Sequence, residues 1–202
     1  MDKKWQKKRL AGNGYLICGG VKMRINVHAG HNPDGKIACG SIGIIKESTE
    51  ARKVVKELKK ILKERGHTVY DCTTNIGTSQ RNVLERIVKK CNAHPVDIDV
   101  SIHFNAGAND RKGNGKTTGC EVLVYSLKGN AFKYAASVCR SIESLGLKDR
   151  GVKERRDLYV LRHTNAPAML VECCFVDDKD DVNRYTAKKM AKAIADGIEL
   201  KK

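Results

Sequence analysis

Two histidines lie at predicted strand ends, where side chains are placed for chemistry. Residues 97–106 alternate, contain β-branched side chains and then break at Asn105, so they predict a strand ending near His103. His31 follows a second predicted strand, residues 23–28, in a loop with glycine and proline. His103 alone is more simply explained as a packed core histidine. Because ligands bind at the carboxyl edge of open α/β sheets, however, we expect both imidazoles at one edge.

Two glutamates occupy comparable places. Glu47 lies in the first turn of a predicted helix, and Glu172 interrupts the apolar run of residues 168–175. An exposed strand end or an ion pair with arginine would explain Glu172 by itself, because an isolated buried carboxylate is costly. Two histidines and a glutamate are also the ligand set of a catalytic zinc, beside which a second carboxylate serves as general base. The pattern favours metal-assisted amide hydrolysis, although widely spaced ligands are a weak signal.

Hydrophobic periodicity predicts alternating strands and helices over most of the chain. Predicted strands cover residues 23–28, 67–72, 97–104, 120–125, 158–161 and 168–175. Predicted helices run from Glu47 to Gly66, from a cap at Thr78 or Ser79 to Cys91, over 131–145 and over about 186–200. This order predicts a single α/β domain with a twisted, mostly parallel sheet of about six strands and helices on both faces. We expect a flexible lead-in over residues 1–21 and the catalytic domain over 22–202, with 105–119 as a binding loop.

The charge of the chain favours a polyanionic partner. Lys and Arg number 39 against 23 Asp and Glu, a formal charge of +16. Nucleic acid, lipid or an anionic wall polymer would each match this positive charge. Nucleic acid has no support beyond the charge, because aromatic residues are only 5% and no nucleic-acid-binding motif is present. A solvated helix face is the plain alternative for one lysine-rich stretch: Lys56, Lys59, Lys60 and Lys63.

The eight cysteines contain no C-x-x-C pair, so we expect mostly reduced core thiols. No run of 18 apolar residues and no secretory signal is present, which predicts synthesis in the cytoplasm without a signal peptide and no transmembrane segment. We expect surface or capping roles for His67, His94 and His163. Arg162 and His163 precede the Glu172 strand closely enough to face a cleft.

Four segments together resemble one enzyme family. They are INVHAGHNPDG, GSIGIIKESTEARKVV, DVSIHFNA and APAMLVECCFVDD, in this order. The chain from about Arg24 to Leu200 is similar to the zinc-dependent N-acetylmuramoyl-L-alanine amidases of bacterial cell-wall hydrolases and clostridial phage endolysins. The resemblance implies that His31, Glu47 and His103 bind one zinc ion and that Glu172 is the catalytic carboxylate. It also implies peptidoglycan as substrate, cleavage between N-acetylmuramic acid and L-alanine, and action at the cell wall after release.

Two departures from the family pattern leave choices open. Many members begin the first motif with Asp-Pro-Gly-His, whereas this chain has His28-Ala-Gly-His31. Gly30 and the strand phase favour His31 as the ligand, with His28 packed behind it. Many members also carry a wall-binding domain, so we expect either that the positive charge does part of its work or that this chain is the catalytic part of a longer protein.

Two other functions fit the residues. A zinc peptidase acting within the stem peptide would use the same metal chemistry. A non-catalytic, basic nucleic-acid-binding protein would account for the charge alone. Metal content separates the second from both enzymes, and the chemical identity of the product separates the two enzymes.

Overall fold

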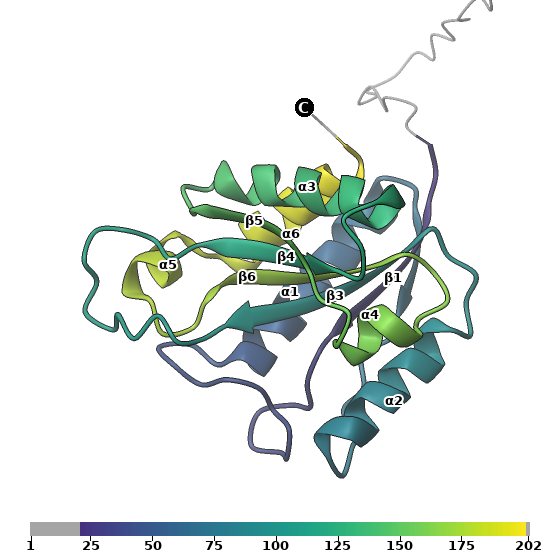
Figure 1. The fold of residues 1–202 in the computed structure, drawn as a ribbon, viewed down its shortest axis with the longest axis horizontal. Coiled ribbons are helices and arrows are strands. Elements are labelled where there is room, and N and C mark those ends of the chain that lie inside the picture. Colours follow the sequence, from purple (N-terminus) through teal and green to yellow (C-terminus); the bar gives the residue numbers. More distant parts are fainter. Residues whose placement is uncertain (1–20, 201–202) are drawn as a thin grey trace, which may run out of the picture.

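The computed structural model describes residues 21–200, so the predicted lead-in lies outside the described residues except for Val21. One sheet of six strands has the order β2-β1-β3-β6-β4-β5 (Figure 1). The strands are β1 (Arg24–Ala29), β2 (Thr68–Asp71), β3 (Ile98–Asn105), β4 (Cys120–Val124), β5 (Asp149–Glu154) and β6 (Ala168–Phe175). Strands β2, β1, β3 and β6 are parallel, β4 is antiparallel to β6, and β5 is parallel to β4. The predicted α/β fold with a mostly parallel sheet is confirmed.

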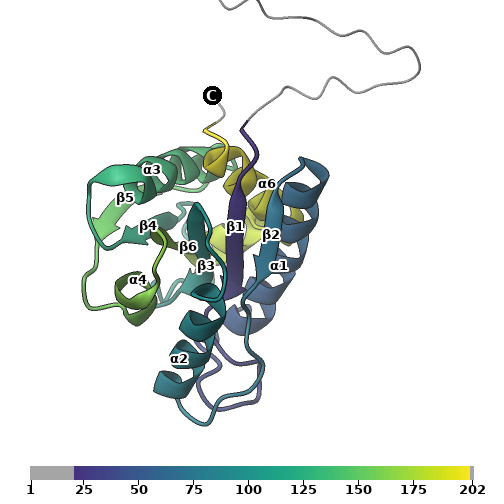
Figure 2. The ribbon, with the colours of Figure 1, turned by 90° about the vertical axis from the view of Figure 1, so that its right-hand side faces the viewer.

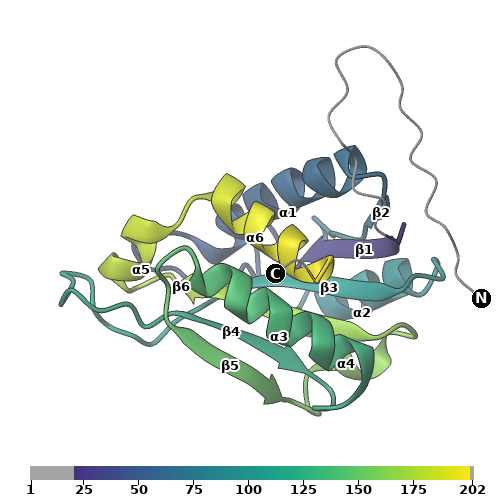
Figure 3. The ribbon, with the colours of Figure 1, turned by 90° about the horizontal axis from the view of Figure 1, so that it is seen from above.

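Helices cover both faces of this sheet, as predicted. They are α1 (Glu47–Glu64), α2 (Gln80–Cys91), α3 (Gly129–Glu143), α4 (Tyr159–His163), α5 (Lys179–Arg184) and α6 (Ala187–Ile198). Helices α1, α6 and α3 lie side by side over one face (Figure 3), and α2 and α4 lie on the other (Figures 1 and 2). Ser79 caps α2 by accepting from Asn82 N, and Thr186 caps α6 by accepting from Lys189 N.

One predicted strand is wrong and one strand escaped prediction. Residues 158–161 form a helical turn, because α4 buries Val160 and Leu161 against α2. A short apolar run cannot distinguish a strand from a helix by periodicity. Strand β5 is a polar edge strand containing Gly151, so it lacks the alternation that marks a half-buried strand.

The two faces of the sheet differ in chemistry. The face under α1, α3 and α6 carries the apolar side chains of β1, β3, β4 and β6, such as Val100 and Val171. On the opposite face, α2 and α4 pack on Leu123 and Leu170. Glu172 lies on this same face, two residues after Leu170. The other side chains that β1, β3 and β4 place on this face are polar: Asn26, His28, Asp99, Ser101, His103 and Glu121. Helices α2 and α4 cover only part of this second face, which we call the half-covered face. Its polar side chains make it the face where chemistry is possible.

Six of the seven described cysteines are buried free thiols, which confirms the expected core role for them; Cys39 is partly exposed. The prediction for Cys18 lies outside the described residues. Within residues 21–200, no helix has both the length and the apolar character needed to cross a membrane.

An acidic run after β6 holds the loop between β3 and β4. Asp177 accepts from the backbone N–H groups of Gly107, Ala108 and Asn109. The buried Asp178 caps α5 and accepts from both the backbone N–H and the hydroxyl of Thr118. The predicted binding loop is therefore tied to the strand that carries Glu172.

We predict that Asp178→Ala lowers the free energy of unfolding by roughly 2–4 kcal/mol, because it removes a helix cap and the charged acceptor of two further donors. Denaturant unfolding monitored by circular dichroism measures the change. Asp34→Ala, which removes the ion pair between Asp34 and Lys46 at the surface, is the matched control and should cost much less. Equal effects of the two substitutions would contradict the role given to Asp178.

Candidate metal and catalytic site

Three predicted site residues converge at the carboxyl edge of the sheet. His31 lies in the loop after β1, Glu47 is the first residue of α1, and His103 lies near the end of β3. One ligand atom from each lies within 4.8 Å of the other two. Glu47 Oε1 is 3.2 Å from His31 Nε2 and 3.1 Å from His103 Nδ1, and the two imidazole rings meet edge to face.

Glu47 is held in place by backbone groups from both sides. Its Oε2 accepts from Ser41 N at 2.7 Å, and its Oε1 accepts from Phe104 N at 3.2 Å. The backbone N–H of Glu47 also donates to Ser41 O, which closes the end of the segment between β1 and α1. Burial favours a raised pKa for this carboxyl, but hydrogen bonds with His103 and His31 outweigh it and hold the pKa well below its usual range. Glu47 is therefore a fixed carboxylate between two imidazoles.

Two glycines make this close approach possible. A Cβ on Gly30 would lie 1.8 Å from His103 Nε2, far closer than non-bonded contact allows. At Gly40, where φ is +79°, a Cβ would lie 2.5 Å from Glu47 Oε2. Only glycine fits at either position without displacing a site residue.

The chemistry of the group suits a metal ion. Burial lowers the pKa of His103, which favours the neutral imidazole that ligates metals. His31 Nδ1 is buried and has no hydrogen-bond partner among the described residues. Two imidazole nitrogens and one carboxylate oxygen form a typical zinc donor set. The residues present therefore fit a zinc ion.

Glu172 lies beside this group on the neighbouring strand. It is the register partner of His103 between the parallel strands β3 and β6, so both side chains are on the half-covered face. Its Oε2 is enclosed and has no hydrogen-bond partner within the described part of the chain. Burial, followed by the charges of Glu47 and Glu121, raises the pKa of Glu172 to about 8. A carboxyl with this affinity for protons can exchange them near neutral pH.

His28 does not join the group formed by His31, Glu47 and His103. It is buried beneath the site, with its Nδ1 3.4 Å from Ser101 Oγ. Burial first, and then the neighbouring His103, lowers the pKa of His28 to about 3, so it stays neutral. This placement agrees with the expectation that His28 packs behind His31.

The other histidines make structural contacts. His67 accepts from Met23 N and contacts the Glu199 carboxylate, and His94 stacks on Tyr70. His163 stacks on Tyr159 and contacts its backbone oxygen.

Glu121 is a polar residue of the same face that our sequence analysis missed. It is the register partner of Glu172 between the antiparallel strands β4 and β6, and it is buried. The available signal was the same as for Glu172, a single carboxylate among the apolar residues of a strand.

A second acidic group, outside the half-covered face, is explained by loop structure. Carboxylate oxygens of Asp110, Asp178 and Asp180 lie within 4.8 Å of one another. All three carboxylates accept backbone N–H groups of the β3–β4 loop or of α5. Asp178 and Asp180 belong to the acidic run after β6, and Asp110 lies in the loop that this run holds.

Comparison with known proteins identifies the family. The family model of N-acetylmuramoyl-L-alanine amidase matches residues 25–200, and the chain belongs to this family. An uncharacterized protein of Clostridium perfringens strain 13 is 40% identical over 184 residues, which cover 89% of this chain and 52% of that protein. The endolysin of Bacillus phage SPP1 is 32% identical over 173 residues, 84% of this chain and 60% of the endolysin. The chain spans about half the length of the curated relatives it matches.

Solved structures share the fold. The catalytic domain of the CD27L endolysin targeting Clostridium difficile superposes with a TM-score of 0.78 at 25% identity, over 89% of this chain and 98% of that domain. The N-acetylmuramoyl-L-alanine amidase AmiC2 of Nostoc punctiforme gives 0.72 at 25% identity, over 89% and 97%. The described part of this chain thus corresponds to a catalytic domain of the family.

The raised pKa of Glu172 predicts a pH-dependent contribution to stability in metal-free protein. The unfolded carboxyl ionises near pH 4.5 and the folded one near pH 8, so between these values the folded state holds a proton that the unfolded state has lost. The contribution of Glu172 is fully present below pH 4.5 and decreases by up to about 1.4 kcal/mol per pH unit as pH rises towards 8.

Glu172→Gln removes this titration, so its stability relative to wild type should rise steadily from pH 5 to pH 8. Thermal unfolding of both proteins in chelator measures the difference, and comparing the two cancels the other titrating groups. A difference that does not change with pH would show that Glu172 ionises normally.

Proposed function

We propose that this domain is a zinc-dependent N-acetylmuramoyl-L-alanine amidase, which hydrolyses the amide bond between N-acetylmuramic acid and L-alanine in peptidoglycan. One observation carries the proposal: His31, Glu47 and His103 meet on the half-covered face beside a second carboxyl, Glu172, whose Oε2 has no partner among the described residues. Membership of the amidase family and the similarity to an endolysin support peptidoglycan as the substrate and the bacterial cell wall as the place of action.

In this proposal His31, Glu47 and His103 hold one zinc ion. When bound, zinc polarises the scissile carbonyl and lowers the pKa of a coordinated water. Glu47 supplies a fixed negative charge, because the backbone N–H groups of Ser41 and Phe104 donate to its two carboxylate oxygens. His103 is kept neutral by burial and is pressed against Gly30, which fixes its ring orientation.

Glu172 is the general base and then the general acid. As the water oxygen attacks the lactyl carbonyl carbon, the Glu172 carboxylate takes the water proton. When the C–N bond breaks, Glu172 passes this proton to the nitrogen of L-alanine, which leaves as a free amine. Burial raises the pKa of Glu172 in the metal-free protein, and a carboxyl with a raised proton affinity suits both transfers.

The two glutamates should respond differently to substitution. We expect Glu47→Ala to lose bound zinc and, as a consequence, activity. Glu172→Ala should keep about one zinc per chain while turnover falls by a factor on the order of 10² to 10⁴, the usual contribution of positioned proton transfer. Metal analysis and lysis of purified walls measure both, and chelation of wild type followed by zinc addition is the control.

Loss of zinc in Glu172→Ala, or near wild-type turnover, would show that the roles are assigned wrongly. Mass spectrometry of the wild-type digest tests the scissile bond. A newly exposed L-alanine amine supports the amidase, whereas a cut further along the stem peptide would indicate a peptidase.

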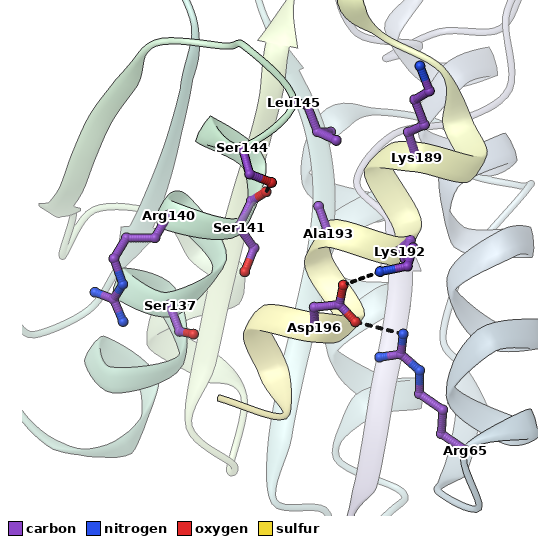
Figure 4. A pocket seen from close by; sticks show the side chains of 10 residues that line it. All are labelled: Arg65, Ser137, Arg140, Ser141, Ser144, Leu145, Lys189, Lys192, Ala193 and Asp196. Carbon is purple, nitrogen blue, oxygen red and sulfur yellow. Dashed lines mark hydrogen bonds and ion pairs between the residues drawn. The ribbon is translucent and has the colours of Figure 1, made fainter. Parts of the chain in front are cut away.

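We propose anionic wall polymers as a secondary partner, bound in the groove between α3 and α6. It encloses about 980 Å³ on the face of the sheet opposite the site (Figure 4). Four cations and one acid, Asp196, line it together with serine hydroxyls: Arg65, Arg140, Lys189, Lys192, Ser137, Ser141 and Ser144. Arg65 and Lys192 share Asp196, while Arg140 and Lys189 form no ion pair within residues 21–200.

Wall binding should therefore weaken with salt, because exposed charges are screened over about 8 Å at physiological ionic strength. We expect the pair Arg140→Glu and Lys189→Glu to reduce co-sedimentation with intact walls at low salt. Arg86→Glu with Lys89→Glu, an equal charge change on α2, is the matched control. Binding that ignores both salt and the groove substitutions would refute an electrostatic contribution.

A further inference from the structure

A group of basic side chains lies beside the proposed general base. Glu121, the register partner of Glu172, accepts from Arg150 Nε at 2.9 Å, from Lys153 Nζ and from Asn105 Nδ2 at 3.2 Å. Burial favours a raised pKa for Glu121, but Lys153 and Arg150 outweigh it and lower the pKa. Glu121 is therefore an ionised anchor for cations.

Strand alternation places Lys153 and Arg155 on the half-covered face. Lys153 is the register partner of Leu123, which packs under α2 and α4 on that face. Arg155 follows two residues later, and its backbone N–H donates to Val124 O, which continues the strand pattern. The positive charge of Arg155 favours the ionised forms of both Glu121 and Glu172, as expected for a guanidinium on their side of the sheet.

The three cations are only partly neutralised by the acids that they contact. Arg150 and Lys153 share the single carboxylate of Glu121, so one positive charge remains. Arg155 binds Asp157 through two hydrogen bonds, 2.8 and 2.7 Å, but this pair is exposed to solvent and contributes little to stability. Arg150, whose guanidinium lies 5.0 Å above the Phe175 ring, is the least exposed of the three. Lys153 and Arg155 retain donors at the solvent side.

We propose that Lys153 and Arg155 form a subsite for a free carboxylate of the stem peptide, which positions the scissile amide against Glu172. The inference rests on the proposed amidase function. A residue that follows L-alanine in the stem carries a carboxylate one amino acid from the scissile bond, and some walls have a carboxamide there instead. Guanidinium and ammonium groups recognise the carboxylate and lose one charge-assisted interaction with the carboxamide. The subsite would make this domain selective for stems with a free carboxylate.

The test compares two soluble N-acetylmuramoyl-L-alanyl-D-glutamyl peptides that differ only in a free α-carboxylate or an α-carboxamide at glutamate. For zinc-loaded wild type, we expect a kcat/KM preference for the carboxylate on the order of tenfold, expressed mainly in KM. Arg155→Gln and Lys153→Gln should each remove most of this preference, because each removes a positive charge that attracts the carboxylate more strongly than the carboxamide.

Arg156→Gln is the matched control. Arg156 is one residue away and carries the same charge, but it pairs with Glu154 and lies over Tyr125, and it is not among the charges that shift the pKa of Glu172. It should keep the wild-type preference. Calorimetric binding of the two peptides to zinc-loaded Glu172→Gln gives the same comparison without turnover, and the carboxylate should bind more tightly.

The outcomes separate the subsite from the amidase function. Wild type that hydrolyses both peptides equally well would overturn the subsite and leave the amidase function standing. Equal losses on both peptides in Arg155→Gln and Lys153→Gln, or loss of preference in Arg156→Gln, would also overturn it. Failure of zinc-loaded wild type to release the L-alanine amine from either peptide would overturn the amidase function, and the subsite with it.

Discussion

The carboxylate of Glu47 is the interaction on which the site depends. It receives hydrogen bonds from the backbone of Ser41 and Phe104 and contacts the imidazoles of His31 and His103. These partners come from the loop after β1 and from the end of β3, while Glu47 itself begins α1. One buried charge thus fixes three segments that are far apart in the sequence. Such a charge is costly to bury unless both carboxylate oxygens keep their partners. A side chain at position 30 would displace His103, and one at position 40 would displace Glu47, so both positions need glycine.

The two faces of the sheet contribute differently to this arrangement. One face is apolar and packs under three helices, so it can supply most of the hydrophobic stabilisation. The other face carries histidines and carboxylates in its central strands, and α2 and α4 cover only part of it. Strand alternation makes the division possible, because in β3 the apolar Val100 and Ile102 point one way while Ser101 and His103 point the other.

Much of this architecture could be predicted from the sequence, because long periodic helices and buried parallel strands leave strong patterns. The location of His31, Glu47, His103 and Glu172 near one edge followed from the order of elements alone. The sequence pattern failed where tertiary contacts decide the secondary structure. Residues 158–161 belong to a helical turn that packs against α2, and β5 is held by backbone pairing with β4 and has few apolar side chains. Glu121 was missed although its sequence signal resembles that of Glu172, and its place beside Glu172 depends on the pairing of β4 with β6, which a sequence does not show.

The pairing of β4 with β6 places a second carboxylate beside the proposed general base. Glu121 of β4 is the register partner of Glu172, and β5 places cations next to Glu121. Without those cations, two neighbouring carboxylates would repel each other, and both would favour protonation. Arg150 and Lys153 keep Glu121 ionised, so Glu172 is the carboxyl of the pair whose pKa is raised. The antiparallel strand thereby separates the proton affinities of two similar residues, one structural and one suited to proton transfer.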